Sequence, residues 1–330
     1  MFRLNDYIAS RGRTPVVPLM SYPGIHLTRS SIKLNEFNWG VHAWTLDSLV
    51  ERFDPDGIFL MMDLAVEASG MGLQVRFPLQ ESPSVEIHPV NIKQDLDQFK
   101  AVDILKDGRA YAFVETLRQL GAMLPAHTLR GAFVTSPFTL AGLLMGAADV
   151  AMKVMLEPDL VQRVLQLATS VATRYALALE DAGAQVIMLL DPSALLLGPK
   201  HFDRFAGSYA GIVADSLRDA APVYHVCGDT TALLDRFADL PVQGLSLDSD
   251  IDLSAAATRV PEDMVLMGNI DPVRTMLRGT SDEVRRAVMQ LRKTMAGRES
   301  FILSSGCDLP ADVPFANIEA FIETGKAPVC

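Results

Sequence analysis

Residues 157–190 read EPDLVQRVLQLATSVATRYALALEDAGAQVIMLL, and this stretch holds the unit from which the rest of the fold is predicted. Its first part places apolar side chains such as Leu160 and Val164 at helical spacing. Pro158 falls in the first turn, where a missing N–H costs nothing, and Gly183 follows the last turn. The final five residues are apolar without interruption. The stretch therefore predicts an amphipathic helix followed by a strand buried on both faces.

The same succession of a short apolar run and a longer amphipathic segment recurs along the chain. We expect eight buried parallel strands, at residues 16–20, 57–62, 129–135, 185–190, 223–226, 244–247, 264–268 and 301–304. Besides the helix that begins at residue 157, we expect helices at 45–53, 109–123, 200–217, 230–237, 281–295 and 316–323. Eight strands alternating with helices predict an α/β protein of the (β/α)8 TIM-barrel type.

An open doubly wound sheet is the alternative fold. It would want a glycine-rich phosphate turn after an early strand, and no G-x-G-x-x-G or Walker-type motif is present, so we favour the barrel. Residues 67–89 interrupt the alternation, and their glycines and prolines predict a β-hairpin inserted after the second strand. Since no linker or low-complexity segment occurs, we expect one domain over residues 1–330.

The composition excludes several classes of function. With 40 acidic and 29 basic residues among 330, the formal net charge is -11, which disfavours nucleic acid and anionic membranes as partners. Three cysteines are too few, and odd in number, for a disulfide framework. The N-terminus has no secretory pattern and the apolar runs are strand-sized, so we expect a cytoplasmic protein with free thiols. The oligomeric state is not predicted.

Polar residues follow most of the predicted strands, where catalytic groups of barrels sit. They are Asp63, Asp191, His225 with Cys227, Asp248, Asn269 and Cys307. His225 and Cys227 lie two apart on one strand and therefore face the same side. Cys307 ends the last strand, and a closed barrel brings strand tips together. One imidazole and two thiolates suit Zn²⁺ and leave its fourth position open, as catalytic zinc sites do.

A structural role for these residues is the alternative. Free cysteines are often buried in cores, and a single histidine on a strand is more often a core residue than a ligand. Cys330, at the chain terminus, has no ligand-like neighbours, and we expect it to be a bystander.

Three motifs carry a resemblance to a known family over residues 14–328. They are YHVCG at 224–228, MGNIDP at 267–272 and SGCDLP at 305–310, and LDP at 190–192 with GPKHF at 198–202 is similar too. The chain resembles the uroporphyrinogen decarboxylase superfamily, and within it the zinc-dependent methylcobamide:coenzyme M methyltransferases. That resemblance implies that His225, Cys227 and Cys307 bind zinc. The arginine-bearing N-terminal signature of the decarboxylases is replaced by LMSYPG at 19–24, which argues against porphyrinogen decarboxylation.

The resemblance implies a reaction and a partner. A thiol such as coenzyme M would bind the open zinc position as thiolate and take the methyl group from a methylcorrinoid. The chain lacks the D-x-H-x-x-G motif of corrinoid-carrying domains, so a separate corrinoid carrier protein is expected to dock transiently. The alternatives are a decarboxylase of the same fold, a demethylase that transfers methyl onto the corrinoid, and a non-enzymatic module.

The remaining polar residues have less certain roles, and each has a structural alternative. Asp63, Glu67 and Asp191 are candidate catalytic residues that would orient substrate or act as bases, and Asp63 or Glu67 could also occupy the fourth zinc position. Asp248 and Asn269 are candidate cofactor-binding residues, Asp248 through a bond to a ligand or substrate and Asn269 by holding its loop. Strand-end caps, turns and salt bridges are the alternatives.

Overall fold

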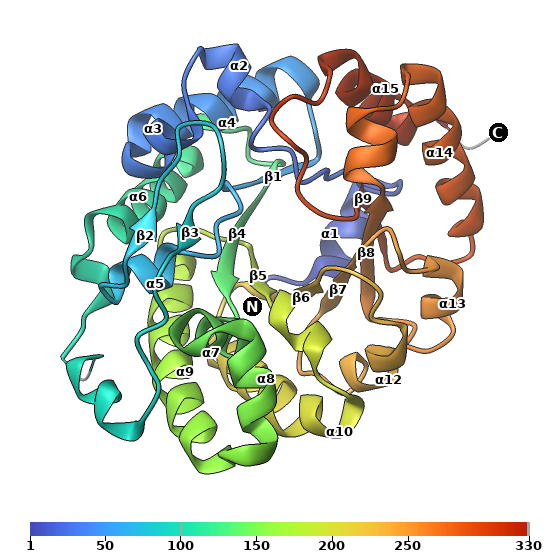
Figure 1. The fold of residues 1–330 in the computed structure, drawn as a ribbon. Helices are drawn as coiled ribbons and strands as arrows, with labels where there is room; N and C mark the ends of the chain where they lie inside the picture. The colour runs from blue at the N-terminus through green and yellow to red at the C-terminus, as the bar shows by residue number, and fades with distance from the viewer. Residues whose placement is uncertain (100, 329–330) are drawn as a thin grey trace.

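The computed structural model describes residues 1–99 and 101–328, so Cys330 lies outside the described residues. Seven strands in this part form one parallel sheet in the order β1-β4-β5-β6-β7-β8-β9. Their bounds are β1 Gly57–Phe59, β4 Leu129–Thr135, β5 Val186–Leu190, β6 Ala221–Val226, β7 Gly244–Leu247, β8 Val265–Ile270 and β9 Phe301–Ser305. Helices surround the curled sheet (Figure 1), so the architecture is α/β and consistent with a TIM-like barrel.

The predicted first strand is reduced to a single β-bridge, between Val16 and Leu303 of β9. Val17 N–H donates to the Leu303 carbonyl at 2.9 Å, and on the other side Asp56 N–H donates to the Val16 carbonyl at 2.9 Å. The segment therefore joins the two edge strands of the sheet. A longer strand does not form because Pro18 brings no N–H to a ladder.

The helices confirm the periodic segments and add elements that the sequence pattern did not predict. The longer helices are α1 Leu4–Arg11, α4 Trp39–Phe53, α6 Gly108–Met123, α7 Pro137–Met145, α8 Ala147–Leu156, α9 Pro158–Asp181, α11 Ser208–Ser216, α14 Ser281–Thr294 and α15 Phe315–Lys326. The shorter ones are α2 Gly24–Thr28, α3 Ile32–Phe37, α5 Val66–Gly70, α10 Pro199–Phe202, α12 Leu234–Phe237 and α13 Leu253–Ala257. Short 3-10 turns are η1 Lys93–Phe99, η2 Ile104–Lys106, η3 Pro192–Leu196 and η5 Thr231–Leu233, and π-helical turns are η4 Asp203–Gly207 and η6 Pro272–Leu277.

Two predicted helices are wrong in detail. The segment 200–217 is not one helix, because the π-helical turn η4 separates α10 from α11. The segment 230–237 begins as the 3-10 turn η5 and is α-helical only in α12. The inserted hairpin is also shorter than predicted: β2 (Val75–Arg76) pairs antiparallel with β3 (Ser84–Val85), while the start of the predicted insertion is helix α5.

Two layers of apolar side chains hold the barrel together. On the inner face of the curled sheet, alternate strand residues such as Phe133, Met188 and Val223 pack together. Their neighbours along the strands, such as Leu189 and Tyr224, lie between the sheet and the helices. Helix α1 contributes Leu4, Tyr7 and Ile8 to the inner cluster and so closes the N-terminal end of the barrel. The side chains of each strand therefore alternate between barrel interior and helix layer.

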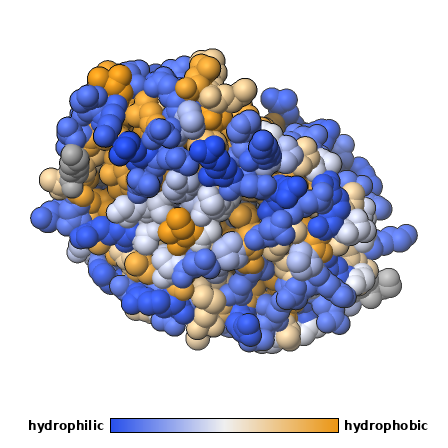
Figure 2. Space-filling model, turned by 90° about the horizontal axis from the view of Figure 1, so that it is seen from below, coloured by the Kyte–Doolittle hydropathy of each residue, from blue (hydrophilic) through white to orange (hydrophobic). Residues whose placement is uncertain are grey.

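In the described residues, no single helix is long and apolar enough to cross a membrane. The pair α7 and α8 passes that test by length and composition, but the two helices meet at a bend of 102°. The face on the side of α8, α9 and α10 carries apolar side chains scattered among hydrophilic ones (Figure 2).

Candidate metal centre

Strand β6 brings His225 and Cys227 to its carboxyl end, and β9 is followed there by Cys307. The His225 Nε2 atom lies 3.2 Å from the Cys227 sulfur and 3.7 Å from the Cys307 sulfur, and the two sulfurs are 3.5 Å apart. The three ligand atoms all lie within 4.8 Å of one another, and they form the group that could hold a metal ion among the described residues. The three side chains therefore lie together, and their role as zinc ligands stays a prediction.

The orientation of the His225 ring is fixed from the neighbouring strand. Its Nδ1 atom lies 3.1 Å from the Ser246 carbonyl and 3.0 Å from the Ser246 hydroxyl, both on β7. Nδ1–H donating to that carbonyl leaves the lone pair of Nε2 directed at the two sulfurs. A second hydrogen bond of this kind sets tautomer and direction in metal-ligating histidines.

The loops that follow three strands are tied together beside the cluster. Asp248 Oδ2 accepts the N–H of Gly228 at 2.9 Å, and Asn269 Nδ2 donates to the carbonyls of Asp248 at 2.8 Å and Ile251 at 2.7 Å. Gly228 has a φ of 84°, a backbone conformation that residues other than glycine rarely adopt. It turns the chain directly after Cys227. Asp248 therefore holds the turn that follows the ligand Cys227, and Asn269 holds the loop that carries Asp248.

The two thiols influence each other's acidity. The hydrogen bond from Cys307 lowers the pKa of Cys227, whereas that same contact and burial raise the pKa of Cys307. Two thiolates at this distance repel, so the pair does not carry two negative charges until a cation arrives.

The donor set and its spacing fit a zinc ion. Tetrahedral coordination with Zn–S of about 2.3 Å and Zn–N of about 2.0–2.1 Å implies ligand atoms about 3.5–3.8 Å apart. The observed separations of 3.5 and 3.7 Å fall in this range, and the separation of 3.2 Å between His225 Nε2 and the Cys227 sulfur is slightly shorter. Three protein donors leave a fourth position free.

A cavity of about 540 Å³ reaches Cys307 from the mouth of the barrel. Its apolar wall includes Met62 and Leu309, and Tyr22 contributes a hydroxyl. Asp308, next to Cys307, also lines it; the carboxylate oxygens are buried and have no hydrogen-bonding side chain among the described residues. Burial first, and then the charge of Cys307, raise the pKa of Asp308 well above its usual value.

The predicted catalytic carboxylates are bonded to other parts of the fold. Asp63 forms an ion pair with buried Arg109 and accepts the N–H of Ala65 at 2.7 Å. Glu67 accepts from the N–H and the hydroxyl of Thr135, at 2.7 and 2.9 Å, and burial raises its pKa to about 7.

Asp191 turns toward the helix layer. It accepts from Tyr224 O–H at 2.7 Å and from the hydroxyl and N–H of Thr139 in α7, at 2.7 and 3.1 Å. Burial raises its pKa. Tyr224 belongs to the outer apolar layer, so Asp191 lies on the opposite face of the sheet from the side chain of His225. Catalytic roles for Asp63, Glu67 and Asp191 stay predictions.

Sequence reasoning missed Ser246, Asp308, Glu36 and Arg109. Ser246 is a polar residue inside an apolar strand, and Asp308 directly follows a predicted ligand, so both had a signal in the sequence. Glu36 is buried on α3 with neither carboxylate oxygen hydrogen-bonded among the described residues, and burial raises its pKa to about 7. Nothing in the local pattern of α3 marks it.

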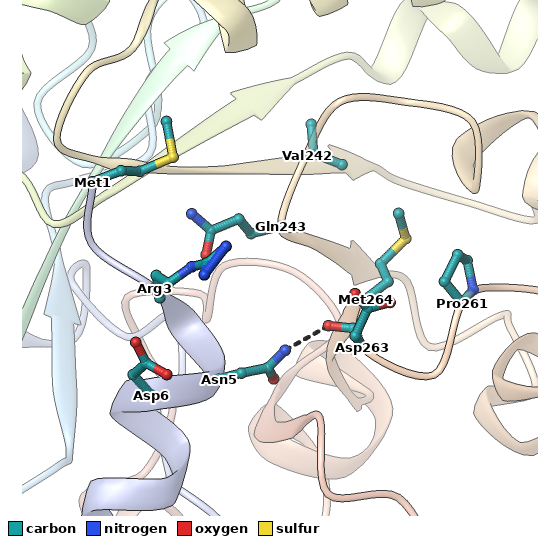
Figure 3. A pocket seen from close by; sticks show the side chains of 9 residues that line it. All are labelled: Met1, Arg3, Asn5, Asp6, Val242, Gln243, Pro261, Asp263 and Met264. Atoms are coloured by element: carbon teal, nitrogen blue, oxygen red, sulfur yellow. Dashed lines mark hydrogen bonds between the residues drawn. The ribbon is translucent and has the colours of Figure 1, made fainter.

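A second cavity, of about 390 Å³, lies at the other end of the strands (Figure 3). Val242, Gln243 and Met264, which precede β7 and β8, face residues of α1 across it, and Asn5 Nδ2 donates to the Asp263 carbonyl at 2.6 Å. Its contacts anchor α1 and gather no metal-ligating set.

The uroporphyrinogen decarboxylase family model matches residues 44–327. The chain belongs to the uroporphyrinogen decarboxylase family. Among relatives, a uroporphyrinogen decarboxylase of Prochlorococcus marinus is 30% identical over 290 residues, covering 84% of this chain and 79% of that protein. A methylcobamide:CoM methyltransferase, MtbA, of Methanosarcina acetivorans is 28% identical over 280 residues, covering 82% and 79%.

Solved structures agree on the fold of this family member. A methyltransferase from Methanosarcina mazei superposes with a TM-score of 0.89 at 23% identity, covering 98% of each chain. A B12-independent methionine synthase from Shewanella reaches a TM-score of 0.63 at 12% identity, covering 95% of this chain and 96% of its own. The family thus contains enzymes of both kinds, decarboxylases and methyltransferases.

Proposed function

We propose that the chain is a zinc-dependent methyltransferase that moves a methyl group from a methylcorrinoid to a thiol. The observation that carries this proposal is the convergence of His225, Cys227 and Cys307 beside a cavity. About 540 Å³ is the size of a small-molecule site, and the opening faces the barrel mouth. We further propose that residues 16–20 serve as the eighth strand of a closed barrel and that residues 1–330 form one domain.

A zinc ion bound there would supply the Lewis acidity that keeps a thiol deprotonated at neutral pH. The residues of the chain do the rest. Ser246 holds the His225 ring, Asp248 holds the turn after Cys227, and the apolar wall around Leu309 excludes water from the thiol. The thiol would release its proton to solvent, and the thiolate sulfur would then attack the methyl carbon in line; the S–C bond forms, and the electron pair of the C–Co bond stays on cobalt.

The methylcorrinoid is a substrate brought by a separate carrier protein that docks transiently at the mouth. Relatives named as methylcobamide:CoM methyltransferases support this donor class. The walls argue against a porphyrinogen: the described residues that line the cavity include Glu81 and Asp312 and no lysine, arginine or histidine, so a polycarboxylate would find no positively charged partner there.

The experiment combines metal analysis with methyl transfer from methylcobalamin to thiols. We expect about one zinc per chain and a methylated thiol as product. Cys307→Ser should lose the zinc and reduce transfer by at least about a hundredfold, since one of three ligands is gone. Cys330→Ser is the matched control and should keep both. Transfer by fully metal-free protein, or turnover of a porphyrinogen without corrinoid, would overturn the proposal.

A further inference from the structure

The two sulfurs of the metal centre border different surfaces. Cys307 lines the cavity of about 540 Å³. Cys227 is partly exposed and is not among the described residues that line that cavity. The chain turns directly after it, at Gly228, where an added Cβ would lie 2.9 Å from Leu195 Cδ2 of η3. Turn η3 therefore packs against the centre on the side of Cys227.

The position of η3 is fixed by buried hydrogen bonds. The Thr139 hydroxyl of α7 donates to Asp191, which precedes the turn, at 2.7 Å, and the same oxygen accepts the Ser193 N–H at 3.0 Å. Ala194 within the turn and Leu197 directly after it are buried in the apolar layer around them. The backbone of η3 is thus held in one place relative to strands β5 and β6.

This rigid turn presents two apolar side chains to the outside. Leu195 is 42% exposed and Leu196 is 54% exposed. No charged residue belongs to η3. Helix α8 packs beside η3 and exposes further apolar side chains, Met155 and Leu156 among them. Exposed apolar side chains that gather beside a reactive centre indicate a binding surface.

The methyl donor of the proposed reaction needs a surface of this kind. A corrin macrocycle with its side chains is larger than the cavity of about 540 Å³, so it has to lie across the mouth of the barrel. The faces of the ring are apolar and its edge carries neutral amides, which remain in water. An uncharged apolar platform matches such a ring, whereas a polycarboxylate would require basic side chains.

We propose that Leu195 and Leu196 form the platform on which the corrin ring of the methyl donor lies, while the acceptor thiol enters by the cavity beside Cys307. This inference rests on the proposed function. Two separate places are required, because displacement in line puts the entering sulfur and the leaving cobalt on opposite sides of the methyl carbon. Contact of Leu195 with the turn at Gly228 brings the platform next to the metal ligands.

Free methylcobalamin is the probe for this platform. Equilibrium dialysis against zinc-loaded protein, without a thiol, measures its dissociation constant. We expect Leu195→Gln to raise this constant about tenfold and Leu196→Gln to raise it at least about threefold, as the loss of apolar contact allows. Leu195→Met conserves volume and polarity and should stay within about twofold of the wild type.

Leu34→Gln is the matched control. Leu34 is 45% exposed and belongs to α3, which packs against α4 and α6, whereas η3 packs against α7, α8 and β6. The same chemical change at this leucine should alter the dissociation constant of methylcobalamin less than about twofold, since surface substitutions away from a site have small effects.

The acceptor side of the centre should not respond to the platform. Binding of 2-mercaptoethanol to cobalt(II)-substituted protein, followed by the thiolate-to-cobalt charge-transfer band, should be equal for wild type and Leu195→Gln. The zinc content should be equal too. In turnover, the loss should appear in the KM for methylcobalamin and leave the KM for the thiol unchanged. A merely structural role for Leu195 would disturb the metal and the thiol as well.

The results separate the inference from the proposed function. The inference is overturned if Leu195→Gln and Leu196→Gln bind methylcobalamin as the wild type does, or if Leu34→Gln weakens binding as much as they do. If Leu195→Gln does not fold, Leu196→Gln decides alone, and wild-type affinity in that variant overturns the inference. If the wild type neither binds methylcobalamin nor transfers its methyl group, the proposed function fails along with the inference. If transfer occurs and both leucine variants match the wild type, only the inference fails.

Discussion

The two halves of the barrel mouth use their polar residues in opposite ways. At the ends of β6 to β9, His225, Cys227 and Cys307 leave their donor atoms free to meet one another. At the ends of β1 to β5, the acidic residues are bonded within the fold: Asp63 to Arg109, and Asp191 to Tyr224 and Thr139. Both groups follow strands of one parallel sheet.

For His225 and Asp191, the difference lies in the face of the sheet to which the side chain points. Strand alternation sends His225 to the barrel interior, while Tyr224 and its partner Asp191 face the helix layer. A polar residue at a strand tip can thus serve chemistry or hold a helix in place. Substitutions at the ends of β6 to β9 should therefore change metal binding, and those at the ends of β1 to β5 should change stability.

The largest effect on stability is expected for Arg109→Met. Arg109 is 2 % exposed and pairs with Asp63, so its removal leaves a buried carboxylate without a counter-charge. Breaking a buried pair from one side costs about 3–5 kcal/mol. Urea unfolding measures this loss. The double variant with Asp63→Asn should recover part of it, because the orphaned charge is gone; a double variant no more stable than the single one would contradict this account.

The next effect is a dependence of stability on pH through Glu67. Burial raises the pKa of Glu67 to about 7 in the folded chain, against about 4.3 when unfolded. Between these values the folded state holds a proton that the unfolded state releases, so the free energy of unfolding falls as pH rises from about 4 to 7. Relative to Glu67→Gln, which cannot titrate, the wild type should lose about 3 kcal/mol across this window.

Chemical unfolding of both proteins at a series of pH values measures that difference. Charges elsewhere in the chain contribute equally to both, so they cancel in the comparison. Parallel curves from pH 4 to pH 8 would show that Glu67 has the same acidity in both states.

The smallest of these effects sharpens the other half of the comparison. Asp248→Ala removes the acceptor for the Gly228 N–H and frees the turn after Cys227. Loss of such a supporting contact weakens metal binding by about 10–100-fold. Competition with a chromophoric chelator measures the zinc affinity. Asp250 is an exposed neighbour, and Asp250→Ala is the matched control. Equal zinc affinities for the two variants would show that Asp248 does not support metal binding.

Prediction from sequence succeeded where one pattern dominates. The continuous apolar runs gave β4 and β7 with their bounds, and the helical period gave α9 and α14. Helix α7 was not predicted, because it is buried on nearly all sides and its apolar residues therefore show no helical period. The break at η4 is a change of hydrogen-bond register between two helical segments, which composition does not reveal.

The candidate site follows the same rule. His225, Cys227 and Cys307 could be predicted because soft ligands are rare and their places in the topology are defined. The partners of Asp63 and Asp191 could not, since Arg109 and Thr139 belong to helices whose packing the sequence does not specify. Only contacts across the fold distinguish a free carboxylate from one already engaged.

Helix α1 constrains the order in which substrates can reach this centre. The side chains of Leu4, Tyr7 and Ile8 pack against the inner apolar layer and close the N-terminal end of the barrel. The barrel is therefore open only at the carboxyl ends of its strands. In the reaction proposed here, the small thiol acceptor and the bulky methylcorrinoid must both enter through this one opening. The acceptor has to load first, and its methylated product waits until the carrier has departed.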